Sequence, residues 1–322
     1  MTTDAGTQPP RVVSLLPAAT EIVAALGAFD QLVGVTHECD HPPAVEWLPR
    51  VTSSTIDRDA ASGAIDSEVR ALAATGAAVF TLDATLVAGL APRVLLTQSV
   101  CAVCALPESE VERAVAALDA PVVVSLGGTT LDGVWDDVRR VGTAIGRRAE
   151  AEELIAASEA RMRLVHETLK AARAPRPRVA VLEWLDPLFV AGHWSPELVR
   201  RAGGVDVLAK PGMHSVRVGV DAVRAANPDV LLFAPCGFDV ERAAREARVL
   251  LGTAEWDWAH DLEAWALDGN ALTSRPGPRL VDAIETMASI FAPGLFGTPK
   301  SIYARSVMCG DATSADQQRQ HG

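Results

Sequence analysis

The sequence lacks the features that mark several whole classes of protein. Its longest apolar stretches, such as residues 71–81, are too short and too interrupted to cross a bilayer. No run of Lys or Arg is longer than a pair such as Arg147-Arg148, and the net charge is −12. We therefore expect neither nucleic acid nor an anionic membrane surface as a partner, and no insertion into a membrane.

Motifs for common enzyme chemistry are also missing. The sequence has no phosphate loop ending in Gly-Lys-Ser, no Gly-x-Ser-x-Gly turn and no His-Glu-x-x-His helix. Residues 1–10 lack a positive region followed by an apolar one, so we expect no secretory signal and a location in the cytoplasm. These absences favour a binding protein over a hydrolase.

The composition is that of a globular chain with two cores. It has 322 residues, of which 49% are hydrophobic and only 5% aromatic. A chain of this length is expected to form two domains.

One short sequence motif occurs twice. Residues 91–98 pair a proline with a Val/Leu run that leads to Cys101 and Cys104, and residues 227–234 repeat this before Cys236. A short apolar run of this kind is typical of a buried parallel strand, whose carboxyl end lies where ligands bind in α/β sheets. The repeat predicts two related lobes that each present thiols at a strand end.

A second repeat supports the first. Residues 11–15 open one half with Arg-Val-Val-Ser-Leu, and residues 178–182 open the other with Arg-Val-Ala-Val-Leu. Each run is followed by an apolar helix that glycine closes. The alternative is that any two α/β halves look alike.

The pattern predicts an α/β fold of two Rossmann-like lobes with parallel sheets, joined by a long helix. Ile155, Met162, Val165 and Leu169 recur at helical spacing and define an apolar stripe on that helix. The predicted boundaries are a disordered start at 1–10, a first lobe at 11–146, the linking helix at 147–174, a second lobe at 175–297 and a disordered tail at 298–322.

Four cysteines follow predicted strands. Cys39, Cys101, Cys104 and Cys236 together equal the number of thiolates that Zn²⁺ or an iron-sulfur cluster takes. The other interpretation is that they fill gaps in the core, because cysteine is among the most buried residues. The sequence leaves both open.

Other side chains near strand ends suit a planar ligand. His37 and Glu38 follow one strand, while Trp184, His193 and Trp194 follow the first strand of the second lobe. Phe238 comes directly after Cys236 and Gly237. Aromatic rings bury large areas in pockets, and an imidazole can ligate a metal, so we select these six as candidate ligand contacts.

The order of these parts resembles the substrate-binding proteins of iron-chelate and vitamin B12 transporters. The resemblance rests on residues 14–21, Ser-Leu-Leu-Pro-Ala-Ala-Thr-Glu, on residues 32–35, Leu-Val-Gly-Val, on the strand at 228–232 and on the long helix. It covers about residues 11–297 and implies the class III periplasmic-binding-protein fold. Within that family, the chain resembles a branch without export signals that is labelled cobalamin-binding.

The resemblance implies a two-lobed receptor that holds a cobalamin-like corrinoid, haem or other metal chelate in the interlobe cleft, with an ABC permease as a partner. The expected walls are Trp184, His193 and Trp194 on one side and His37 and Cys39 on the other. The alternative function is a metalloprotein or enzyme whose Zn²⁺ or iron-sulfur site is formed by the four cysteines.

Overall fold

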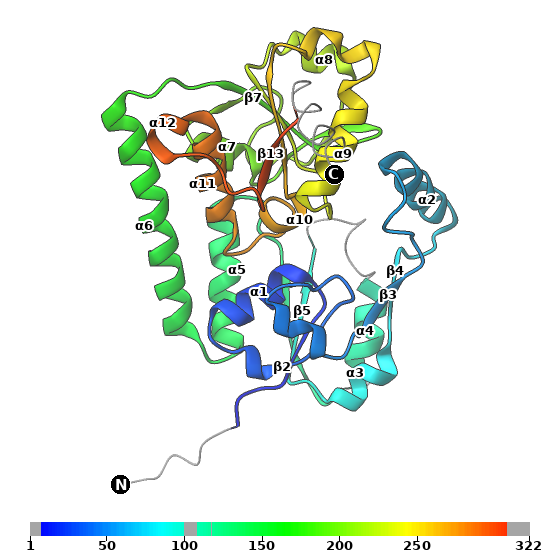
Figure 1. Ribbon diagram of the computed structural model, residues 1–322. Coiled ribbons are helices and arrows are strands. Elements are labelled where there is room, and N and C mark those ends of the chain that lie inside the picture. The colour runs from blue at the N-terminus through cyan, green and yellow to red at the C-terminus, as the bar shows by residue number, and fades with distance from the viewer. Residues whose placement is uncertain (1–7, 100–107, 117, 308–322) are drawn as a thin grey trace, which may run out of the picture. The chain divides into compact units, whose positions relative to one another are not determined.

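The first sheet is built from short apolar strands, of which the two central ones are buried almost throughout. In the computed structural model, which describes residues 8–99, 108–116 and 118–307, β5 (Val94–Gln98) lies parallel between β1 (Val12–Ser14) and β6 (Val122–Leu126). β2 (Leu32–Gly34) adds in parallel to the other side of β1. The predicted repeat at 91–98 therefore forms a strand that has neighbours on both sides (Figure 1).

Helices cover both faces of this sheet. On one face, α3 (Ala84–Leu90) and α4 (Glu108–Ala116) pack against Val13 and Leu95. Val12 and Leu96, their neighbours in the strands, point to the other face and are equally buried. A parallel sheet needs this double cover because both of its faces are apolar.

The helices α1 (Pro17–Ala25) and α5 (Leu131–Ala144) pack against each other and contact β1 and β6. Thr130 caps the N-terminus of α5, since its hydroxyl accepts a hydrogen bond of 3.2 Å from the backbone N–H of Gly133.

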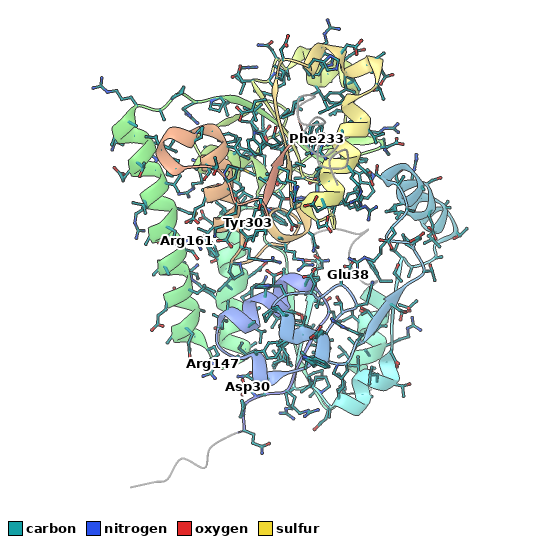
Figure 2. All side chains as sticks on the ribbon, in the orientation of Figure 1. Asp30, Glu38, Arg147, Arg161, Phe233 and Tyr303 are labelled. Carbon is teal, nitrogen blue, oxygen red and sulfur yellow. The ribbon has the colours of Figure 1, made fainter. Side chains whose placement is uncertain are left out.

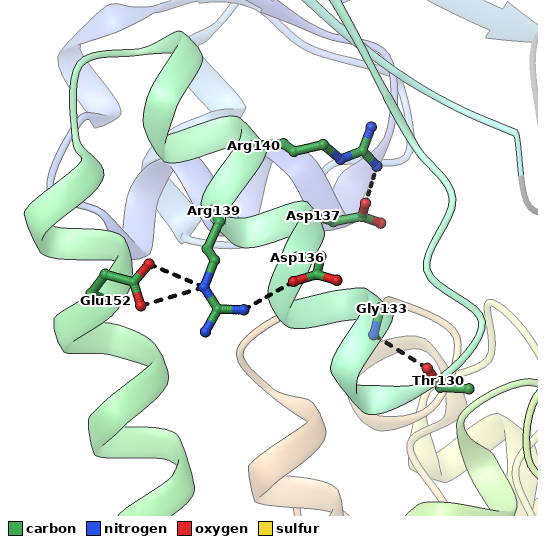
Figure 3. A network of polar contacts seen from close by, with 7 residues as sticks. All are labelled: Thr130, Gly133, Asp136, Asp137, Arg139, Arg140 and Glu152. Atoms are coloured by element: carbon green, nitrogen blue, oxygen red, sulfur yellow. Dashed lines mark hydrogen bonds and ion pairs between the residues drawn. The ribbon is translucent and has the colours of Figure 1, made fainter.

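A polar network ties α5 to the turn that follows β6 and to the next helix, and Figure 3 shows the part of it on α5 and that helix. Asp137 is 2% exposed, and its Oδ2 accepts hydrogen bonds from the backbone N–H groups of Gly127 and Gly128 at 3.0 and 2.9 Å. Arg140 also pairs with Asp137. Arg139 bridges from α5 to Glu152 on the following helix at 3.0 Å.

The long helix is α6 (Arg148–Ala172), close to the predicted 147–174. Ile155, Met162 and Val165 of its predicted stripe are buried. On another face, Arg161, labelled on α6 in Figure 2, donates to Glu285 at 2.8 Å and to Asp282 at 2.5 Å. The part of α6 from Glu159 onward thus belongs to the second unit, and there it is tied to two carboxylates of the helix Leu280–Phe291.

The second sheet repeats the order of the first. β11 (Val230–Phe233) lies parallel between β7 (Arg178–Leu185) and β12 (Glu263–Leu267), and β9 (Val205–Asp206) runs parallel on the other side of β7. The parallel strands thus read β2-β1-β5-β6 in one sheet and β9-β7-β11-β12 in the other. The two copies of the repeated motif form β5 and β11, which occupy equivalent positions in the two sheets. This confirms the fold class that the sequence predicts.

Three antiparallel strands extend the second sheet. β8 (Leu188–Val190) returns along the end of β7, and β10 (Val216–Arg217) pairs with β8. β13 (Ala304–Ser306) pairs with β12 at the opposite edge.

One face of the second sheet is covered by α8 (Val220–Ala225), α9 (Val240–Leu251) and the 3₁₀ helix η3 (Ala254–Ala259). Trp256 of η3 is fully buried and stacks on Trp258. The helices α7 (Ser195–Arg201) and α11 (Leu280–Phe291) pack against each other. Short helices α10 (Gly269–Leu272) and α12 (Pro293–Phe296) flank α11.

A separate antiparallel pair of strands, β3 (Thr52–Ser54) and β4 (Phe80–Leu82), brackets the helix α2 (Ser62–Thr75). The remaining short elements of this half are the 3₁₀ helices η1 (Phe29–Gln31) and η2 (Pro43–Trp47).

The two compact units are not continuous in sequence. One consists of Met1–Arg58 and Ser67–Ser158, and the other of Asp59–Asp66 and Glu159–Gly322. Within the second unit, Arg242 of α9 donates to the carbonyl of Ala60 at 2.5 Å, and Glu246 accepts from the backbone N–H of Ser62 at 3.3 Å. The segment Asp59–Asp66 is therefore held by α9, although the predicted boundary at 146 assigns it to the first lobe.

The predicted disordered tail at 298–322 is wrong for residues 304–306. These residues form β13, whose backbone pairs with Trp265, Ala266 and Leu267 of β12. The polar composition of the tail concealed this strand, because an edge strand is stabilised by backbone hydrogen bonds that need no apolar run. Cys309 lies outside the described residues.

We expect Asp137→Ala to destabilise the first unit by about 2 kcal/mol, because it leaves the backbone N–H groups of Gly127 and Gly128 without their acceptor. The urea midpoint, followed by circular dichroism, measures the loss. Asp136→Ala is the control, since that carboxylate is 71% exposed and should cost less than about 0.5 kcal/mol. Equal midpoints for the two variants would contradict the role of Asp137.

Candidate functional site

In the first unit, His37 lies just beyond β2 and is held by Thr52 of β3. Its Nδ1 is 2.7 Å from the Thr52 hydroxyl, which also accepts the backbone N–H of His37 at 3.1 Å. The imidazole is tilted against the ring of Phe80 with centroids 5.4 Å apart. Two contacts from β3 and β4 therefore orient a side chain that the sequence places at the end of β2.

The other ring nitrogen of His37 has no hydrogen-bond partner among the described residues, although the atom is buried. Burial lowers the pKa of His37, and the charges of Arg58 and Arg50 lower it further, against an opposing effect of Glu38. The imidazole is therefore neutral at pH 7. In the tautomer that carries its proton on Nδ1, Nε2 presents a lone pair.

Cys39 and Glu38 are fixed by the same loop. The thiol of Cys39 is 3% exposed and lies 3.1 Å from the hydroxyl of Thr20 and 3.6 Å from that of Thr36. Arg50 donates to the carbonyl of Cys39 at 2.7 Å. These contacts place the thiol in the interior of the first unit, so we withdraw Cys39 from the predicted wall of the ligand site.

The predicted four-thiol site is only partly described. Cys101 and Cys104 lie outside the described residues, and Cys236 is half-buried in the second unit, with its backbone N–H bonded to the carbonyl of Glu183 at 3.0 Å. Among the residues that the structure describes, no three His, Cys, Asp or Glu side chains are grouped so that they could hold a metal ion. The convergence of the four thiols stays a prediction.

In the second unit, two predicted ligand contacts form one aromatic pair at the ends of β7 and β11. Trp184 and Phe238 have ring centroids 5.3 Å apart. Trp184 is half-buried and donates through Nε1 to the carbonyl of Asp186 at 3.0 Å. Phe238 is only 2% exposed, and the guanidinium of Arg242 lies 3.5 Å above its ring. Trp184 is thus the accessible member of the pair and Phe238 its support.

His193 is held in an unusual conformation beyond β8. Its φ of +51° lies in the left-handed region, where a side chain other than glycine is strained. The backbone compensates, because the N–H of His193 donates to the carbonyl of Met213 at 2.6 Å and its carbonyl accepts from Gly212 at 2.9 Å.

The strained residue meets a second histidine. Nε2 of His193 is 3.3 Å from Nδ1 of His214, and the two rings meet edge to face. Burial lowers the pKa of His193, and the neighbouring His214 lowers it further. At pH 7 the imidazole of His193 is therefore neutral.

Trp194 does not offer an open face. It is 6% exposed, and its Nε1 donates to the carbonyl of Thr273 at 2.8 Å. We chose Trp194 from the sequence because it adjoins His193. In the structure it lies at the start of α7, and its indole points into the core. We therefore correct its predicted role from ligand contact to packing.

The loop that carries His214 begins at a buried carboxylate. Oδ1 of Asp206 accepts hydrogen bonds from the backbone N–H groups of Leu208 and Ala209 at 2.9 and 2.8 Å. Its Oδ2 is buried without a hydrogen-bond partner among the described residues. Burial raises the pKa of Asp206 to about 6, although the two backbone hydrogen bonds oppose the shift.

Sequence reasoning missed Thr52, Asp206 and His214. Of these three, only His214 had a recognisable sequence feature, since it lies in a turn with Gly212 and Ser215. Nothing in the spacing pairs it with His193, 21 residues earlier. Thr52 falls in a stretch without an apolar run, and its role depends on the pairing of β3 with β4.

The sequence pattern of the periplasmic binding protein family matches residues 12–257. A vitamin B12-binding protein of Vibrio cholerae is 25% identical over 291 residues, which cover 87% of this chain and 88% of that protein. The crystal structure of a periplasmic haem-binding protein of Pseudomonas aeruginosa superposes with a TM-score of 0.69 at 22% identity, covering 92% of this chain and 97% of that one.

The crystal structure of the periplasmic vitamin B12-binding protein of Vibrio cholerae superposes with a TM-score of 0.60 at 22% identity, covering 88% of this chain and 97% of that one. Within the described ranges, no helix has both the length and the apolar character that crossing a membrane requires.

We expect Asp206→Asn to stabilise the protein by about 2 kcal/mol at pH 8, because Asn keeps an acceptor for Leu208 and Ala209 and removes a buried charge. A carboxyl whose pKa is raised to about 6 on folding binds its proton more tightly in the folded state. The advantage of the variant should therefore shrink as the pH falls through 6 toward 4.

Thermal or urea unfolding from pH 4 to 8 measures this difference. Asp221→Asn is the matched control, because it removes the same charge from an exposed carboxylate of α8. A constant difference between Asp206→Asn and the unmodified protein over this range would contradict the assignment.

Proposed function

Because the chain belongs to the periplasmic binding protein family, we propose that it is a substrate-binding protein for a metal chelate of the corrinoid or haem type. Relatives that cover nearly its whole length are described as binding vitamin B12 or haem. Both ligands are large, flat macrocycles with a metal at the centre. The chain would need a group that faces the metal and ring surfaces that contact the macrocycle.

The observation that carries the ligand class is Nε2 of His37, a buried ring nitrogen without a hydrogen-bond partner among the described residues, which a ligand would reach once the half-buried imidazole turns outward. A buried polar atom without a partner costs about 1–3 kcal/mol, so such an atom in a native fold calls for an explanation. A metal centre satisfies an imidazole lone pair directly, and the neutral state of His37 at pH 7 keeps that lone pair available. Its contact with Thr52 supplies the second hydrogen bond that orients a ligating imidazole.

The second unit offers surface for the macrocycle. Trp184 is half-buried and is braced from behind by Phe238, so its indole can contact an apolar ring without losing its hydrogen bond to Asp186. The His193–His214 cluster adds two further imidazoles beyond β8. We propose both as ligand contacts, alongside the half-buried Glu38 in the first unit.

The relatives also suggest a partner. One curated relative, 22% identical, is described as an uncharacterized substrate-binding lipoprotein of an ABC transporter in Bacillus subtilis. We propose an ABC permease as the partner of this chain. The location in the cytoplasm stays a prediction of the sequence. Cell fractionation tests it, because it shows whether the protein is in the cytoplasm or is exported.

Hydroxocobalamin and hemin are the probes that test the ligand class. We expect one of them to remain with the protein after desalting and to change its visible spectrum on binding. His37→Ala should weaken this binding at least about tenfold, since it removes the ligating atom. His260→Ala is the matched control, because His260 is an exposed histidine of the second unit.

Each result has a distinct meaning. If neither probe binds, the ligand class is wrong. If a probe binds and His37→Ala leaves its affinity and spectrum unchanged, the metal is not ligated by His37. Trp184→Ala and His193→Ala then test the ring contacts of the second unit with the same probe.

A further inference from the structure

The second unit contains a cavity beside the starts of β7 and β9, which Arg176 and Gly203 precede in the chain. It is formed by the second half of α6, by α7 and by the segment that joins α6 to β7, and it has a volume of about 510 Å³. Cavities of this size hold small organic molecules.

The cavity is basic in an acidic protein. Six of the 29 Lys and Arg residues line it, and no Asp or Glu does, although the net charge of the chain is −12. The six are Arg163, Lys170, Arg173, Arg176, Arg200 and Arg201. His166 also lines the cavity and adds a further donor.

Neighbouring carboxylates neutralise only part of this charge. Arg163 pairs with Glu159 at 3.6 Å. Lys170 lies 4.0 Å from Glu167, and Arg200 lies 3.1 Å from Glu197. Arg173 and Arg201 form no ion pair with any residue that the structure describes.

Stabilisation of helix ends explains some of these residues but not all of them. Cations in the last turn of a helix interact favourably with its dipole, which accounts for Lys170 in α6 and for Arg200 and Arg201 in α7. Arg163 lies more than two turns before the end of α6. Arg176 lies beyond α6, where it donates to the carbonyl of Gly204 at 3.1 Å.

The remaining lining is apolar. Met162 is 4% exposed, and Leu169 and Pro175 lie beside it in the cavity wall. Gly203 reaches the same wall with a φ of +98°, and a Cβ there would lie 2.8 Å from Leu169. The cavity thus combines an apolar wall with guanidinium groups, which suit the oxygens of phosphate.

We infer that this cavity binds a soluble phosphorylated anion with an apolar part, of the nucleoside di- or triphosphate class. The phosphates contact Arg173, Arg201 and their basic neighbours, and the nucleoside packs on Met162, Leu169 and Pro175. The net negative charge of the whole chain opposes a long polyanion, which favours a small ligand over nucleic acid.

Isothermal titration of the full chain with ATP, inorganic triphosphate and adenosine tests this inference at low and high salt. We expect ATP to bind more tightly than triphosphate, adenosine to bind most weakly, and the binding of both anions to weaken as salt rises. Arg173→Gln combined with Arg201→Gln should weaken ATP binding about tenfold or more.

The matched control is Arg224→Gln combined with Arg245→Gln, which removes the same charge from exposed positions of α8 and α9. Circular dichroism confirms that each variant is folded. The inference is overturned if neither anion binds at millimolar concentration, or if both double variants weaken ATP binding equally. Tighter binding of triphosphate than of ATP would refute the nucleoside contact.

Discussion

Backbone pairing of strands that are buried on both faces is the constraint on which this structure depends. β11 consists of Val, Leu and Phe, and β5 begins with Val-Leu-Leu and is buried up to Thr97, so each must find two neighbouring strands and a layer of helices on both sides. Parallel pairing then brings the carboxyl ends of neighbouring strands to one edge. His37 beyond β2 and Trp184 at the end of β7 owe their positions to this arrangement, because the loops that carry them leave the sheets at those ends.

The sequence was sufficient for the centre of each sheet and insufficient for the edges. Proline followed by a Val/Leu run predicted β5 and β11, because a fully buried strand must be apolar throughout. β13 consists of Ala, Arg and Ser, and it exists because the backbone of β12 is available beside it. No pattern within three residues can report a neighbour almost 40 residues away. The same reasoning applies to β3, whose Thr52 orients His37.

For the candidate site, residue type was easier to predict than exposure. His37 and Trp184 are half-buried, whereas Trp194 and Cys39 are buried and form hydrogen bonds to Thr273 and Thr20. A Trp or Cys beside a strand end has the same sequence signature whether it faces a ligand or the core. The outcome depends on the direction in which the next helix starts, and tertiary packing decides that direction.

The segment Asp59–Asp66 has a consequence for how the protein is made. Ser62 and Glu246, which hold each other in the second unit, are 184 residues apart. During synthesis this segment leaves the ribosome long before α9 is made. It can form its contacts with α9 only after most of its own unit has been translated. Closing so long a loop costs chain entropy that grows with the logarithm of its length. Cutting the gene within α6, after Ser158, would leave the first half with all of its own unit, but it would separate the second unit from Asp59–Asp66, which the first half carries.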